Sequence, residues 1–148
     1  MPVETDRALR EILEQARTIA VLGLKAAPEE DAHRVALYLQ QHGYRIVPVN
    51  PKLKEALHEP AYASLAQLSV PTDLIDVFRA SEHLPGHVDE ILAMHPRPSV
   101  VWFQLGIRSD ACARRLEAAG IRVVQDRCIM VEHRRLLAGQ SGGAASPP

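Results

Sequence analysis

The chain has 148 residues, of which 47% are hydrophobic and 24% charged, and its formal net charge is −1. This length suits one domain with a core of its own, and the composition excludes disordered and fibrous proteins. Because the charges nearly balance, there is no overall basic field to attract nucleic acid. The longest apolar runs are about six residues, far below the ~20 that cross a bilayer, so neither a nucleic-acid nor a membrane partner is expected.

The first part of the chain alternates between helical and strand patterns. Residues 5–16 predict a short amphipathic helix, because Leu9, Ile12 and Leu13 recur at helical spacing. Residues 18–23 form a nearly continuous apolar run, which is typical of a parallel strand covered on both faces. A second helix is predicted over about 29–42, ending before Gly43.

The same alternation continues to residue 126. Further strands are predicted at 44–50, 72–78, 99–105 and 121–126, and residues 53–71 predict a loop with one short helix near 64–68. Helical patterns lie over 84–95 and between Ser109 and Gly120, and a last helix follows Cys128. Five alternations predict an α/β fold: a three-layer, doubly wound, five-stranded parallel sheet. We expect one domain over 1–138 and a flexible tail over 139–148.

A ligand of such a sheet is expected at the carboxyl ends of the strands, where strand order reverses. The residues that follow the five predicted strands are Gly23, Leu24 and Lys25; Asn50, Pro51 and Lys52; Phe78 and Arg79; Gln104, Leu105 and Gly106; and Asp126, Arg127, Cys128, Ile129 and Met130. These ends carry polar, cationic or glycine residues, and their clustering is the main functional signal.

The turn after the first strand argues against NAD. The dinucleotide fingerprint that begins at Gly23 requires glycine where this chain has Lys25 and Pro28. In addition, Asn50 stands where NAD binding needs a carboxylate for the ribose hydroxyls. Phosphates held by the side chains of Lys25, Arg34 and Arg79 fit the sequence better.

Several segments in order resemble the small stand-alone coenzyme A-binding domain proteins. They are "IAVLGL" with "HRVALYLQQHGY", "PVNPK", "DVFRASE", "VWFQLGI" and "DRCIMVEH", within about residues 15–137. That family is similar to the CoA-binding Rossmann domain at the start of the succinyl-CoA synthetase alpha subunit. The resemblance implies a Rossmann-like fold and a bound CoA or acyl-CoA. The sequence departs from the family at Lys25, Ala32 and His33, where serine, serine and tyrosine are usual.

The resemblance also assigns roles to residues. Those implied to hold phosphates are Gly23, Leu24, Lys25 and Arg34, with Asn50 and Pro51 as the asparagine-proline element; Phe78 and Arg79 flank the adenine and phosphate region, and Gln104, Leu105, Gly106, Cys128, Ile129 and Met130 border the pantetheine path. We therefore expect a non-catalytic CoA-binding protein. Two alternatives stay open: an NADP-dependent oxidoreductase in which Lys52 meets the 2′-phosphate, and a CoA-binding subunit of a multi-chain ligase.

The remaining candidates have simpler interpretations. Cys112 and Cys128 lack metal-type spacing and the density of secreted scaffolds, and no cleavable apolar leader is visible, so a reducing cytoplasm and no metal are expected. Cys128 is expected to be a small buried residue, and His133 a salt-bridged or capping histidine beside Glu132. No complete catalytic set is recognisable. Trp102 and Phe103 are predicted to lie in the core, and Arg114 and Arg115 on a solvated helix face. A partner subunit or a homo-oligomer stays open as an alternative to a monomer.

Overall fold

The computed structural model describes residues 3–138 and contains one five-stranded parallel sheet. Its strands, in spatial order, are β2 (Arg45–Val49), β1 (Thr18–Leu22), β5 (Leu74–Val77), β6 (Val100–Phe103) and β7 (Arg122–Val124). The helices are α1 (Asp6–Gln15), α2 (Asp31–Gln41), α3 (Leu84–Leu92), α4 (Asp110–Ala118) and α5 (Ile129–His133), which continues as a π-helical turn over Arg134–Ala138. The predicted doubly wound fold is confirmed, while the tail predicted over 139–148 lies outside the described residues.

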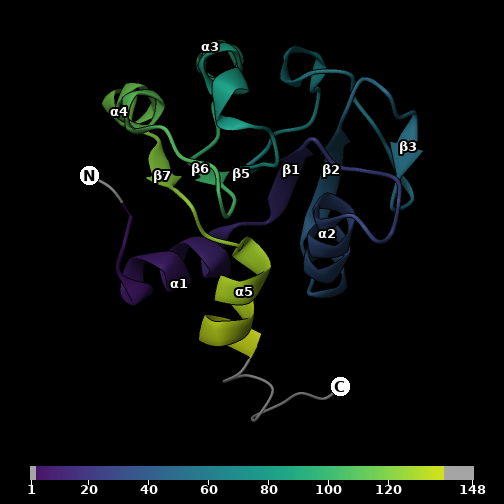
Figure 1. Ribbon diagram of the computed structural model, residues 1–148, viewed down its shortest axis with the longest axis horizontal. Coiled ribbons are helices and arrows are strands. Elements are labelled where there is room, and N and C mark those ends of the chain that lie inside the picture. Colours follow the sequence, from purple (N-terminus) through teal and green to yellow (C-terminus); the bar gives the residue numbers. More distant parts are fainter. Residues whose placement is uncertain (1–2, 139–148) are drawn as a thin grey trace.

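The helices form a layer on each face of the sheet (Figure 1). Helices α1, α2 and α5 cover one face, where Ile19, Val21 and Trp102 belong to the core. Helices α3 and α4 cover the other face, against Ala20, Leu22 and other strand residues. Because side chains alternate along a strand, each central strand contributes to both cores, which explains its continuous apolar sequence. Trp102 and Phe103 are fully buried, as predicted.

The two edges of the sheet are partly covered by neighbouring chain. At β2, the Tyr62 N–H donates to the Pro48 carbonyl at 3.0 Å and the Asn50 N–H donates to the Tyr62 carbonyl at 2.9 Å. At β7, the Val3 N–H donates to the Val123 carbonyl at 3.3 Å. Such contacts satisfy N–H and C=O groups of the edge strands. Left unpaired, these groups could form hydrogen bonds with a strand of another chain. Within residues 3–138, no helix is both long and apolar enough to cross a membrane.

The region expected to be a loop over 53–71 also contains a small hairpin. Strands β3 (Glu55–Ala56) and β4 (Glu59–Pro60) are antiparallel and joined by Leu57 and His58, whose φ angles are 55° and 66°. A turn with both central φ angles positive is usually marked by asparagine and glycine, so the sequence held no signal for it. A short 3₁₀ turn at Leu65–Gln67, called η1, agrees with the predicted short helix.

One buried group on β5 has no charge partner. Asp76 is fully buried, lies in register between Val21 of β1 and Trp102 of β6, and its two carboxyl oxygens find no hydrogen-bond partner within the described chain. Burial raises the pKa of Asp76 well above its ordinary value of 3.8. Burial therefore favours the neutral form of this carboxyl group in the folded state.

We expect the stability of the protein to depend on the proton of Asp76. Since the folded-state pKa exceeds that of the unfolded chain, the folded state holds an extra proton between the two values. The free energy of unfolding should then fall above about pH 4, by about 1.4 kcal/mol per pH unit for this proton. Urea unfolding of wild type and Asp76→Asn from pH 4 to 8 measures this. A difference between the two proteins that does not change with pH would contradict it.

Candidate functional site

The strand order places a crevice between β1 and β5. The chain leaves β1 for α2 on one face of the sheet and leaves β5 for α3 on the other, so the two connections diverge at neighbouring strand ends. In open parallel sheets this reversal point opens a space for a ligand. Gly23 follows β1 there, and Phe78 and Arg79 follow β5.

Gly23 allows the two strand ends to lie in contact. Its φ angle is +92°, and its N–H donates to the Val49 carbonyl at 2.9 Å. A Cβ atom built at Gly23 would lie 2.7 Å from the Phe78 carbonyl oxygen and 3.2 Å from Cδ of Arg79. Both the backbone angle and the lack of space thus require glycine here.

A hollow on the α2 side of Gly23 has a mixed charge. Its volume is about 340 Å³, and its lining is Gly23, Lys25, Glu29, Glu30, Asp31, Ala32 and Phe78. Lys25 therefore faces a helix start that carries three carboxylates. Arg34, expected to meet a phosphate, forms an ion pair with Asp31 and is about half exposed, outside this lining. The acidic residues reduce the attraction that the helix dipole offers an anion.

A smaller hollow lies on the α3 side of Gly23. It measures about 190 Å³ and is lined by Leu22, Gly23, Val49, Asn50, Pro51, Ala63, Ser64, Arg79, His87 and Glu90. Two nitrogen atoms of this lining, Nε of Arg79 and Nε2 of His87, are buried and find no hydrogen-bond partner in the part of the chain that the structure describes. Buried polar atoms of this kind are normally satisfied, so they mark a place for an additional polar group.

His87 and Glu90 were missed by the sequence analysis. Both lie on α3, and Nδ1 of His87 is 3.0 Å from Oε1 of Glu90. The only sequence signal was the i,i+3 spacing of a histidine and an acid, which is common on solvated helix faces. What brings them to the strand ends is the packing of α3 beside the Arg79 segment.

Asn50 stabilises the backbone of the site through hydrogen bonds, one of which reaches the carbonyl group of Leu24. Nδ2 of Asn50 donates to the Leu24 carbonyl at 2.8 Å, and its Oδ1 accepts from the Lys52 N–H at 2.9 Å. The side chain of Leu24 is fully buried. Asn50 therefore joins the turn after β1 to the turn after β2, with its amide already occupied by protein partners.

The residues after β6 and β7 form a second group, and the two hollows beside Gly23 do not include them. Oε1 of the buried Gln104 accepts from the Ile129 N–H at 3.0 Å, and the Gly106 N–H donates to Oδ1 of Asp126 at 2.7 Å. Ile129 is fully buried, Cys128 and Met130 are partly buried, and the side chain of Leu105 is 69% exposed. The strand ends therefore form two neighbouring groups rather than one continuous lining.

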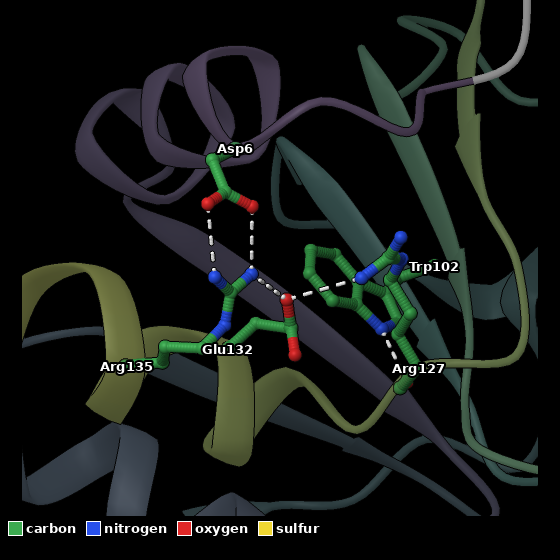
Figure 2. Close-up of polar contacts among 5 residues, drawn as sticks. All are labelled: Asp6, Trp102, Arg127, Glu132 and Arg135. Carbon is green, nitrogen blue, oxygen red and sulfur yellow. Dashed lines mark hydrogen bonds and ion pairs between the residues drawn. The ribbon is translucent and has the colours of Figure 1, made fainter.

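An ion-pair network holds the segment after β7 in place (Figure 2). Nε1 of Trp102 donates to the Arg127 carbonyl at 2.8 Å, and the guanidinium of Arg127 lies 3.3 Å from Glu132. Arg135 contacts the same carboxylate at 2.6 Å and also Asp6 of α1 at 2.9 Å. Its hydrogen bond holds the pKa of Asp6 below the ordinary range. The network thus ties α1, α5 and the Cys128 segment together.

His133 is not the salt-bridged or capping histidine that the sequence suggested. Its Nδ1 lies 2.9 Å from the Tyr38 hydroxyl, in an aromatic cluster with His42 and Tyr44. Burial, with a smaller effect of His42, lowers the pKa of His133 to about 4. The ring is therefore neutral at neutral pH, and Glu132 pairs with arginines instead.

Two larger hollows lie elsewhere on the molecule. One of about 770 Å³ follows the outer edge of β7 and α4, and one of about 650 Å³ lies between the η1 region and α3. Neither includes Gly23 or Arg79. Among residues 3–138, no group of three or more His, Cys, Asp or Glu side chains is placed to hold a metal ion.

A doubly wound sheet with a tight glycine turn at its reversal point defines the class of α/β proteins that bind ligands at strand ends. Within that class, the family described as CoA binding domain matches residues 17–134, and the chain belongs to this family. The resemblance seen in the sequence is therefore confirmed.

Known proteins agree with this assignment. A Bacillus subtilis (strain 168) protein, YneT, described as uncharacterized, is 39% identical over 84% of this chain and 91% of its own length. A solved Thermus thermophilus structure has 48% identity and a TM-score of 0.85, covering 90% of this chain and all of that one. A dinucleotide-forming acetyl-coenzyme A synthetase of Ca. Korarchaeum cryptofilum shares the fold, with a TM-score of 0.61, 19% identity and coverage of 72% of this chain and 25% of its own.

Replacing Gly23 should test the contact between the strand ends. Gly43 is the matched control, since its φ angle is +97° but an added Cβ would have no described neighbour within 4 Å. We expect Gly23→Ala to lower the free energy of unfolding by about 1–3 kcal/mol more than Gly43→Ala, because overlap with the Phe78 carbonyl adds to the backbone strain. Chemical denaturation measures both, and equal losses would contradict a close contact.

Proposed function

We propose that the protein binds CoA or an acyl-CoA across the strand ends and does not itself catalyse a reaction on it. The observation that carries this proposal is Nε of Arg79, buried beside the Gly23 turn without a hydrogen-bond partner in the described chain. A guanidinium in that position suits a phosphate oxygen, which it meets with strong charge-assisted hydrogen bonds. Membership of the CoA binding domain family supports the choice of ligand.

The residues at the strand ends suit the separate parts of CoA. Gly23, Lys25 and Arg79 would hold phosphates, while Asn50 keeps the turns after β1 and β2 in register. The exposed side chain of Leu105, with Cys128 and Met130, would border the apolar pantetheine arm. Bound CoA would supply the thiol that carries an acyl group. Arg34, engaged by Asp31, would have to leave that ion pair before it could meet a phosphate.

The contacts of the candidate catalytic side chains support a binding role rather than a catalytic one. His133 is tied to the Tyr38 hydroxyl, and Glu132 to Arg127 and Arg135. Neither is available as a base for the thiol of Cys128, which a nucleophilic mechanism would need. Both cysteines are free thiols, which suits a reducing cytoplasm. A partner subunit or a second copy would add groups that this chain does not supply.

Isothermal titration with CoA, acetyl-CoA and a long-chain acyl-CoA tests the function. We expect heat of binding with CoA and a smaller or absent signal with NADPH, because Lys52 is outside both hollows beside Gly23. Absence of heat with CoA and with both acyl-CoAs would remove the proposal. Binding of NADPH alone would favour the oxidoreductase alternative. Co-purification of a second chain that forms acyl-CoA would favour the ligase subunit.

Arginine substitutions should distinguish this site from the rest of the surface. We expect Arg79→Ala to weaken CoA binding by about tenfold to a hundredfold, as loss of a charge-assisted hydrogen bond implies. Arg114→Ala is the control, because Arg114 is exposed on α4 and lines only the hollow along β7 among those described here. The same titration measures both variants, and equal effects would place the ligand elsewhere.

A further inference from the structure

The hollow beside α3 is lined by two side chains that each have an unsatisfied buried nitrogen atom. Nε of Arg79 comes from the segment after β5, and Nε2 of His87 comes from α3. Both atoms are buried, and neither finds a partner among residues 3–138. Buried polar atoms are normally paired, so two unpaired ones in one small space indicate a ligand group.

Glu90 fixes the position of the His87 ring. Oε1 of Glu90 lies 3.0 Å from Nδ1 of His87, and the two side chains are only 31% and 18% exposed. An imidazole that donates to a carboxylate through Nδ1 leaves Nε2 for a second partner.

We propose that this hollow is the subsite for a phosphate monoester, with Arg79 and His87 as its two donors. The inference rests on the proposed function, and it assigns the 3′-phosphate of CoA to this subsite. A phosphate monoester carries a charge of about −1.5 to −2 at neutral pH, which suits the guanidinium of Arg79, while Nε2 of His87 offers a further hydrogen-bonding atom. The volume of about 190 Å³ suits one group of a ligand, since pockets for whole ligands span about 300–1,000 Å³.

The charges around the two hollows separate the monoester from the rest of the ligand. In the α3-side hollow the only carboxylate of the described lining is that of Glu90, and this carboxylate already contacts Nδ1 of His87. In the α2-side hollow, Lys25 faces Glu29, Glu30 and Asp31. The most highly charged phosphate is therefore attracted to the Arg79 side. The diphosphate, with less charge on each phosphorus, is left to the Gly23 and Lys25 turn.

Comparing CoA with 3′-dephospho-CoA tests this assignment, because the two differ only in the monoester. We expect wild type to bind CoA at least about tenfold more tightly, the ratio that one charge-assisted hydrogen bond provides. His87→Gln should remove most of that advantage while leaving the affinity for 3′-dephospho-CoA unchanged within about twofold. Titration calorimetry measures all four affinities.

His83→Gln is the matched control. His83 lies one turn earlier, is 47% exposed beside Glu82, and is absent from the lining of the hollow. It should leave both affinities as in wild type. Thermal unfolding checks that each variant is folded; if His87→Gln is not, Glu90→Gln replaces it, with the same loss of CoA preference expected.

The outcomes separate the two proposals. If His87→Gln weakens CoA and 3′-dephospho-CoA equally, or changes neither, the subsite assignment is overturned while CoA binding stands. If wild type binds both ligands with equal affinity, the monoester does not occupy a built subsite and the inference is also overturned. If wild type binds neither ligand, the proposed function itself fails, and the inference that rests on it fails with it.

Discussion

The contact between the end of β1 and the end of β5 is the constraint on which the site depends. A Cβ at Gly23 would be 2.7 Å from the Phe78 carbonyl oxygen, closer than non-bonded atoms approach. With no side chain there, the backbone of one strand end packs directly against that of the other. Arg79 is held beside this contact, the turn toward α2 begins on its other side, and Asn50 joins β2 to the same point. Two hollows on opposite sides of one glycine follow from this packing.

Buried polar groups without partners occur at the site and directly below it. Nε of Arg79 and Nε2 of His87 open into one hollow, whereas the carboxyl group of Asp76 lies in β5 between Val21 and Trp102. Under the proposed function, the first two would gain a partner when a phosphate binds, which would offset the cost of leaving them unpaired. Asp76 lies on β5, two residues before Phe78, and the cost of burying it is lower when the carboxyl group keeps its proton.

Hydrophobic patterns, which report burial, predicted the fold correctly. They did not predict which polar side chains form hydrogen bonds or ion pairs with one another. Five continuous apolar runs gave the five strands, and the residues predicted to follow them do so. Leu57 and His58 form a turn with positive φ angles, although neither residue type is typical of such turns. Arg34, expected to contact a phosphate, forms an ion pair with Asp31. His133, expected to pair with an acidic residue or to cap the helix, lies at hydrogen-bond distance from the Tyr38 hydroxyl. The roles implied for the individual site residues stay predictions.

Sequence alone was enough for the α/β class, the parallel sheet, the polar strand ends and the family, because each depends on local hydrophobic pattern or on short motifs in order. Tertiary structure decided which strand ends meet. Order β2-β1-β5-β6-β7 puts Gly23 against Phe78, and separates Gln104 and Cys128 from the hollows beside Gly23. It also brought His87 and Glu90 to Arg79. Such pairings join residues far apart in the chain, so they depend on how helices pack on the sheet, which no local pattern encodes.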